Sequence, residues 1–206
     1  MKTNSLAKDF GPARINTMKR MDEAPSARLI ADCLAGDEHA IEILVRQYEA
    51  DVFRLALSIV GDTAEANEIT QETFIAMLRS LHSYEERKSF KAWLYTIALN
   101  HSRSHLRRRK SLERLRDALS VLFRVETQKL LSPEDAVIRN EQERVLWEQL
   151  NSMDERFRTV VVLRYFHDLS IAEISEILSV NEGTIHSRLH TARERLKQAL
   201  DVAAGE

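Results

Sequence analysis

Cysteine, proline and glycine are scarce in this chain, and each scarcity excludes something. Of its 206 residues, one is cysteine, three are proline and five are glycine. The single cysteine, Cys33, excludes an internal disulfide bond and a zinc site built on cysteines. No proline lies between residues 26 and 132, and the Asn-Gly and Asp-Gly dipeptides that favour β-hairpins are absent. We therefore predict an all-α fold.

Long apolar runs are also missing. No run approaches the roughly 20 apolar residues that span a bilayer, and the N-terminus has no signal-peptide core. We therefore expect a soluble, cytoplasmic protein with no membrane insertion.

Charge is segregated along the chain, although the formal net charge is only −2. Between residues 32 and 72 the acidic side chains are opposed only by Arg46 and Arg54. Between residues 87 and 116 the basic side chains face only Glu113. A charge acts on a partner within a Debye length of about 8–10 Å, so the local balance matters more than the total. The low net charge therefore does not argue against a nucleic-acid partner.

Apolar periodicity divides the chain into two small helical domains. Residues 1–27 show no sustained period, which predicts a disordered extension. Residues 28–110 form the first predicted domain. It has a short helix that ends at Gly36, and further helices at about 37–60, 63–81 and 89–108. Residues 134–206 form the second, in which helices at about 134–151 and 155–166 precede a final helical pair.

Residues 111–133 join the two domains and are too apolar for a flexible spacer. One interpretation is a helical segment that packs on the chain's own domains. The other is a linker that becomes ordered against a partner protein. The sequence favours neither.

The final helical pair, residues 170–200, has the pattern of a helix-turn-helix. Ser170 and Glu173 form an S-x-x-E capping box, and Asn181 can cap the second helix. The outer face of that second helix carries arginine, lysine, small hydroxyls and two histidines rather than alternating Glu and Lys. This composition favours binding in the DNA major groove over an ordinary helical hairpin.

Four motifs occur in a characteristic order. They are TQETF at 70–74, SFKAWLYTIALN at 89–100, RRRK at 107–110, and LRYFHDLSIAEISEIL followed by EGTIHSRLHTARERL between 163 and 196. Together they resemble the extracytoplasmic-function group of the sigma-70 family, bacterial RNA polymerase sigma factors built from region two and region four.

The resemblance implies a protein that directs core RNA polymerase to promoters. Region two would bind the clamp helices of the largest subunit and open the −10 element. Region four would read the −35 element and rest on the flap of the second-largest subunit. A probable further partner is an anti-sigma factor, because the group usually has one.

The resemblance and the charge pattern together give three sets of contact residues. Contacts to core polymerase are expected from the third helix, at Asn67, Glu68, Gln71 and Glu72. Contacts to the −10 element are expected from Tyr84, Arg87, Lys88, Lys91, Asn100, Arg103, Ser104, Arg107 and Arg108. Contacts to the −35 element are expected from Glu182, Thr184, His186, Ser187, Arg188, His190, Thr191 and Arg193.

Two aromatic residues are candidates for stacking on an unpaired base. Trp93 shares the helical phase of Phe90 and Ile97, so we expect it in the core. Tyr84 lies in the loop before that helix and is expected to be open.

Catalytic and metal-binding patterns are missing. His101 and His105 stand four residues apart, as do His186 and His190, but no cysteine or carboxylate completes either pair in the sequence. We find no nucleophile–base set and no phosphate-binding glycine loop, and we expect a non-catalytic protein without metal or cofactor.

Two other functions remain open. A sigma mimic that only occupies an anti-sigma factor would have no use for the basic residues between 103 and 110. A free-standing helix-turn-helix regulator would leave the acidic third helix unexplained.

Overall fold

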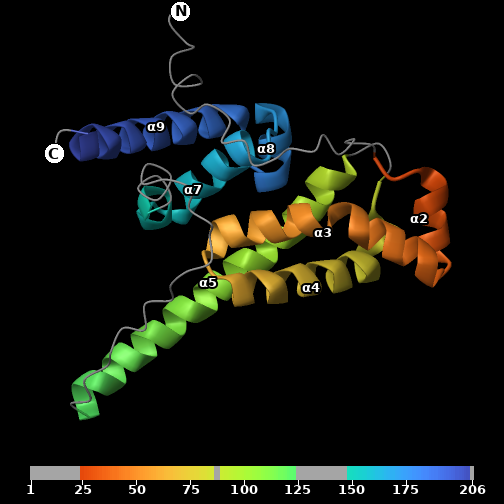
Figure 1. Ribbon diagram of the computed structural model, residues 1–206, viewed down its shortest axis with the longest axis horizontal. Coiled ribbons are helices and arrows are strands. Elements are labelled where there is room, and N and C mark those ends of the chain that lie inside the picture. Colours follow the sequence, from red (N-terminus) through yellow and green to blue (C-terminus); the bar gives the residue numbers. More distant parts are fainter. Residues whose placement is uncertain (1–23, 86–88, 124–147, 205–206) are drawn as a thin grey trace, which may run out of the picture.

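The computed structural model describes residues 24–85, 89–123 and 148–204, and its regular elements in these ranges are all helical (Figure 1). The prediction of an all-α fold is therefore confirmed. Among the described residues, no helix combines the length and the apolarity needed to cross a membrane. The elements are α2 (Ala27–Leu34), α3 (Glu38–Val60), α4 (Thr63–Ser80), the short 3-10 helix η1 (Leu81–Ser83), α5 (Phe90–Phe123), α7 (Glu155–Val161), the π-helical segment η2 (Val162–Phe166), α8 (Ile171–Leu178) and α9 (Glu182–Ala204).

Short polar residues set where α3 and α4 begin. Asp37 accepts a hydrogen bond from the Ala40 amide at 2.9 Å, and Asp62 accepts one from the Glu65 amide at 2.8 Å. Each bond satisfies an amide that the first turn of a helix leaves free. Gly61 ends α3 in the left-handed conformation, with φ of 72°, and turns the chain directly into the cap of α4.

Helices α2 to α5 form the N-terminal bundle, in which α3, α4 and α5 pack on one another and α2 packs across one end of α3 (Figure 1). Its core consists of the apolar stripes of the three long helices, including Leu44, Leu55, Ile69, Met77 and Leu94, which are buried almost completely. These stripes are the ones that the helical period of the sequence predicts.

Helices α7 to α9, with η2, form the C-terminal bundle. Ile174 and Ile177 of α8 meet Ile185, Leu189 and Ala192 of α9 in its core. The predicted capping box is present. The Glu173 amide donates to Ser170 Oγ at 3.2 Å, and the Ser170 amide donates to Glu173 Oε2 at 2.7 Å. Asn181 caps α9 by accepting from the Thr184 amide at 2.8 Å, so α8 and α9 form the expected helix-turn-helix.

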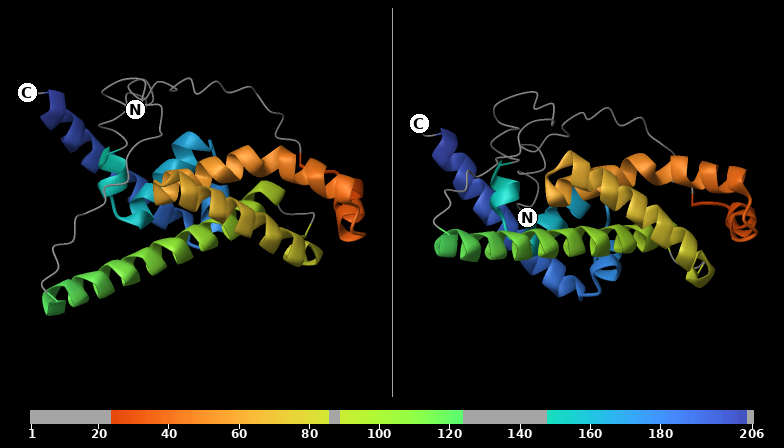
Figure 2. Two further views of the ribbon diagram at one scale, coloured as in Figure 1. Left: turned by 60° about the horizontal axis from the view of Figure 1, so that its bottom comes forward. Right: turned by 90° about the horizontal axis from the view of Figure 1, so that it is seen from below.

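Helix α5 is longer than the sequence pattern predicts. The expected end near Arg108 is wrong, because the helix continues without interruption to Phe123 (Figure 2). It therefore runs through the first part of the segment assigned as a linker, residues 111–133. Side chains 111–114 on this extension are exposed. Good helix formers such as Leu, Arg and Glu fill the extension, and no glycine or proline stops it.

Some of the expectations fall on residues outside the described ranges. These are most of the N-terminal extension, the second part of the linker and most of the helix expected at about 134–151. Of that last helix, residues 148–152 are described and are helical.

The left-handed turn at Gly61 predicts a measurable effect on stability. The Gly61→Ala variant should lower the free energy of unfolding by about 1 kcal/mol, because a Cβ disfavours positive φ. Gly183→Ala is the matched control. Gly183 lies in the first turn of α9 at an ordinary φ, and an added Cβ would meet only Asn181 Oδ1 at 3.5 Å. In Gly183→Ala the free energy of unfolding should rise by up to about 1 kcal/mol, because alanine favours the helix more than glycine does. Urea unfolding of both variants checks the two signs, and equal effects would contradict the turn assignment.

Candidate nucleic-acid interface

One stripe of α5 is both polar and open to solvent. Asn100, Ser104 and Arg107 follow one another along the helix at three- or four-residue spacing, and all three are exposed. Arg108 is exposed beside them. The opposite side of the helix is buried against α3 and α4 through residues such as Leu94 and Ala98. The stripe can therefore reach a ligand without any change in the fold of the N-terminal bundle.

Two other predicted α5 contacts are already engaged within the chain. Arg103 is half-buried, and its Nε donates to Glu155 Oε1 of α7 at 2.8 Å. Lys91 is half-buried, with its Nζ 5.9 Å from the centre of the Tyr95 ring. These cations reach another molecule only by leaving their present neighbours. Arg87 and Lys88 lie outside the described residues.

Tyr84 is less open than the sequence suggests. It is half-buried, and its ring meets the edge of Phe90 with centroids 5.1 Å apart and planes at 86°. Trp93 lies 5.4 Å from Tyr84 and is half-buried against the core, which agrees with its expected packing. The expectation of an open tyrosine is wrong because the Tyr84 ring packs on Phe90 in the first turn of α5. The three rings form one aromatic cluster beside the stripe.

The four residues of the RRRK run differ in their exposure to solvent. Arg107, Arg108 and Lys110 are exposed, but Arg109 is half-buried and points into the bundle. Its Nη1 donates to the Val60 carbonyl at 3.2 Å and lies 3.5 Å from Glu65 Oε2. Arg109 thus joins the end of α3 to the start of α4, and it does not belong to the exposed stripe.

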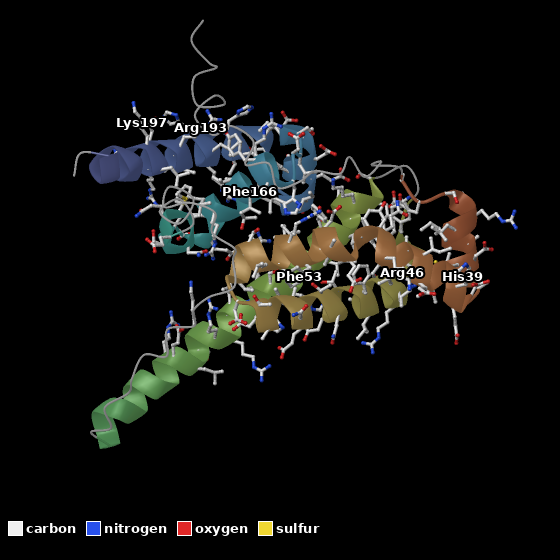
Figure 3. The ribbon with its side chains drawn as sticks, in the orientation of Figure 1. His39, Arg46, Phe53, Phe166, Arg193 and Lys197 are labelled. Atoms are coloured by element: carbon white, nitrogen blue, oxygen red, sulfur yellow. The ribbon has the colours of Figure 1, made fainter. Side chains whose placement is uncertain are left out.

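The second polar face lies on α9, where Glu182, His186, Ser187 and His190 are exposed. Thr184, Arg188, Thr191 and Arg193 are half-buried along its borders. Figure 3 shows Arg193 and Lys197 on the side of α9 that faces away from α3. All eight residues expected from the sequence therefore line one helix, with the exposed ones in its first three turns.

The three hydroxyl groups on this face bond to their own helix. Thr184 Oγ1 donates to Asn181 Oδ1 at 2.8 Å, Ser187 Oγ donates to the Thr184 carbonyl at 3.0 Å, and Thr191 Oγ1 donates to the Ser187 carbonyl at 3.0 Å. Their oxygens keep lone pairs that can accept from a base edge. The imidazoles of His186 and His190 can donate as well as accept.

Arg195 is a further basic residue of α9, and it contacts an aromatic ring of α7. Its guanidinium lies 4.6 Å from the centre of the Phe157 ring, and Arg156 lies 4.7 Å from the same centre. The two cations therefore cover Phe157 of α7, a cation–π arrangement that stabilises the C-terminal bundle. Burial also lowers the pKa of the neighbouring Arg158, whose Nη1 donates to the Asn151 carbonyl at 3.3 Å.

The acidic and amide face of α4 is exposed at Asn67, Glu68, Gln71 and Glu72. Ile75, one turn beyond Gln71, is half exposed on the same side of the helix. Sequence reasoning missed Ile75, although its phase differs from that of the buried residues Phe74 and Met77. An apolar residue among polar ones is typical of the centre of a protein-binding surface.

Among the described contacts of this face, those of Glu72 reach another helix. Its Oε2 lies 3.0 Å from His101 Nδ1 and 3.1 Å from His105 Nε2, both on α5. The histidine pair that the sequence left incomplete thus has a carboxylate partner from α4. Among the described residues, no three His, Cys, Asp or Glu side chains are placed to hold a metal ion.

Comparisons with known proteins match both bundles. The model of Sigma-70 region 2 matches residues 44–112, and that of Sigma-70 region 4 matches residues 143–196. The ECF RNA polymerase sigma factor SigW of Bacillus subtilis is 32% identical over 171 residues, which cover 80% of this chain and 91% of that protein. The RNA polymerase sigma-H factor of Pseudomonas aeruginosa is 32% identical over 178 residues, which cover 84% and 92%.

Two solved structures share the fold. CnrH in complex with the cytosolic domain of CnrY matches with a TM-score of 0.62 at 22% identity, covering 85% of this chain and 96% of that chain. The sigma factor RpoE of Bartonella quintana, in complex with the anti-sigma factor NepR, matches with a TM-score of 0.62 at 24% identity, covering 78% and 94%.

The contrast between Arg109 and its neighbours predicts effects of different size on the free energy of unfolding. Arg109→Ala should lower the free energy of unfolding by about 1–2 kcal/mol, because the Val60 carbonyl loses a charged donor in a partly exposed position. The double variant Arg107→Ala, Arg108→Ala should change it by less than about 0.5 kcal/mol. Urea unfolding of both variants measures the difference. A double variant that is less stable than Arg109→Ala would contradict this division.

Proposed function

Since this chain belongs to the extracytoplasmic-function group of the sigma-70 family and serves promoter-specific transcription initiation by RNA polymerase, we propose that three of its surfaces divide the work. The exposed stripe of α5 takes the −10 element, the first turns of α9 take the −35 element, and the polar face of α4 takes core polymerase. The observation that carries this proposal is the exposed row of Asn100, Ser104 and Arg107 beside an aromatic cluster.

Opening of the −10 element needs groups that hold a separated strand. Removing a base from the stack costs a few kcal/mol, and stacking on an aromatic ring returns roughly 1–3 kcal/mol per base. Arg107 and Arg108 supply charge for phosphates, while Asn100 and Ser104 supply groups that hydrogen-bond to bases. Tyr84 packs with Trp93 and Phe90 in one aromatic cluster, so it is not an open wedge. Lys91 and Arg103 add positive charge on α5, and Arg87 and Lys88 are assigned to the same element from the sequence alone.

Recognition of the −35 element falls to the start of α9, as in other helix-turn-helix proteins. Ser187 and His190 are exposed about one turn apart and face the groove, with Glu182 and His186 beside them. Arg188 and Arg193, at the borders, are placed for phosphates. His186 and Thr191 stand where the family often has basic residues, so we expect fewer phosphate contacts and an unusual −35 preference.

Core polymerase is the partner that suits the α4 face. Phosphates would repel Glu68 and Glu72, whereas a basic protein surface would attract them. Asn67 and Gln71 add hydrogen-bonding groups, and Ile75 adds an apolar contact one turn beyond Gln71. We assign this face to the clamp helices of the largest subunit, and we assign the C-terminal bundle to the flap of the second-largest subunit.

The remaining partners follow from the same assignment. The solved relatives include sigma factors held by CnrY and by the anti-sigma factor NepR, which supports a corresponding anti-sigma partner for this chain. The chain acts as a non-catalytic specificity subunit, and its place of work is the cytoplasm, where polymerase and DNA meet. The domain boundaries at 28–110 and 134–206 are those of region two and region four, joined through the extended α5.

Removal of the two exposed arginines should separate DNA opening from polymerase binding. In the Arg107→Ala, Arg108→Ala variant, run-off transcription from a cognate promoter should fall at least tenfold, because two charged contacts to phosphate are lost. Affinity for core polymerase should stay within about twofold. Run-off gels and a core-binding titration measure the two effects.

The matched control for that experiment removes two arginines from the opposite end of the N-terminal bundle. Arg28 and Arg46 are exposed on α2 and α3, where each forms only a local ion pair. The Arg28→Ala, Arg46→Ala variant should transcribe like the parent chain. Normal run-off transcription by the Arg107→Ala, Arg108→Ala variant would contradict the assignment of the −10 element to the α5 stripe.

Base readout by α9 should be visible in promoter preference. Ser187→Ala and His190→Ala should each change the preferred −35 sequence in a promoter library, because each removes a group that faces the base edges. Gln198→Ala, on an exposed position near the far end of α9, is the control and should keep the parent preference. An unchanged preference in both test variants would move base recognition to other residues.

A further inference from the structure

The two bundles lie against each other in this structure. Helix α5 packs on α8, and α3 packs on α7 and η2 (Figure 2). By their names, the −10 and −35 elements are about 25 base pairs apart, or about 85 Å along B-form DNA. Two bundles that are packed against each other cannot reach two DNA elements that far apart. If the proposed function holds, the bundles must separate before both promoter elements are bound.

A tyrosine–histidine pair crosses the contact between the bundles. Tyr95 Oη of α5 lies 2.9 Å from His167 Nδ1, which follows η2. The two rings meet edge to face, with centroids 5.1 Å apart and planes at 83°. Tyr95 is fully buried. His167 Nε2 is shut off from solvent and has no hydrogen-bond partner among the described residues.

We propose that the Tyr95–His167 contact is an acid-sensitive switch. Neutral His167 holds the two bundles together, and protonated His167 releases them so that the promoter-binding surfaces can separate.

The physical reason is the surroundings of the imidazole. In the neutral ring Nδ1 pairs with the Tyr95 hydroxyl, as acceptor or donor according to the tautomer, and Nε2 stays unpaired as an uncharged atom. The protonated ring carries its charge with an N–H at both nitrogens, and among the described residues no acceptor lies within hydrogen-bonding distance of Nε2. Burial accordingly lowers the pKa of His167 to about 4.

Charged groups of the neighbouring helices do not reverse this effect. Asp51 of α3 favours the protonated ring, but its carboxylate is paired with Arg54, which opposes protonation. Lys91 of α5, next to the Tyr95 ring, opposes it as well.

The acidic and basic side chains of α8 and of the residues next to His167 either bond to other groups or are exposed to solvent. Glu173 of α8 is bound to Ser170 in the capping box, and Glu176 is exposed. Arg164 donates to the Leu169 carbonyl, and Asp168 is exposed. None of these four side chains has a hydrogen bond to His167 among the described contacts.

The direction of the pH effect follows from the lowered pKa. The closed arrangement favours the neutral ring, so its advantage is complete above the ordinary histidine pKa of about 6.5 and decreases as the pH falls toward 4. With these two values, lowering the pH from 7.5 to 5.5 should raise the ratio of separated to packed chains about tenfold. The ion pair between Arg103 and Glu155 also joins the two bundles, and it contains no imidazole.

The experiment measures the distance between the bundles in the full chain. A Cys33→Ala background with Arg79→Cys on α4 and Lys197→Cys on α9, both exposed positions, carries a donor and an acceptor dye. Single-molecule energy transfer at pH 7.5 should show a dominant high-efficiency population. At pH 5.5 the low-efficiency population should rise about tenfold relative to it.

Two variants assign the response to His167. His167→Gln keeps a side chain that can pair with Tyr95 but does not titrate, so its populations should be the same at both pH values. His101→Gln, which removes a histidine that faces Glu72 inside the N-terminal bundle, should respond like the parent chain. A parent chain whose populations do not change with pH would overturn the proposal. So would a His167→Gln chain that separates as the parent does, or a His101→Gln chain that does not respond.

Discussion

Helix α5 has to fit three neighbours around one circumference, and the rest of the structure depends on its fit to α3 and α4. Small residues make that fit close. Ala98 and Ser102 are buried, and the Ser102 hydroxyl donates to the Ala98 carbonyl at 2.8 Å, so no polar atom is stranded in the contact. With one side fixed in the bundle, Tyr95 is directed to the C-terminal bundle, and Asn100, Ser104 and Arg107 remain for a ligand. A rotation of the helix would disturb all three surfaces together.

Local signals made much of the fold predictable. The caps at Ser170 and Asn181, and stripes of apolar residues at helical spacing, depend only on neighbours a few positions away, and the structure shows them where the sequence places them. The exposed members of the α4 and α9 faces follow for the same reason. Once the buried phase of a helix is known, the opposite phase is known as well.

Contacts between helices were not predictable in this way. Arg109 looks like its two neighbours in the sequence, and only the approach of Val60 and Glu65 makes it structural. Glu72 looks like a free acidic residue, and only the packing of α5 on α4 brings two histidines to it. Tyr84 looks like an open loop residue in the sequence, and only its packing on Phe90 makes it half-buried. The length of α5 was missed on other grounds: a charged, leucine-rich stretch without a stop signal suits a linker and a helix equally.

The contact between the bundles contains an ion pair that can be exchanged at little cost, beside apolar side chains of both bundles that share one core cluster. Arg103 and Glu155 are 30% and 32% exposed, and an ion pair in such a position contributes at most about 1 kcal/mol. In the proposed −10 complex Arg103 would exchange Glu155 for a phosphate, one charged partner for another, so the ion pair itself would oppose separation only weakly. The Tyr95–His167 pair differs, because its histidine loses a closed pocket and gains water. In the proposed switch, therefore, the protonation state of His167 rather than the ion pair determines how readily the bundles part.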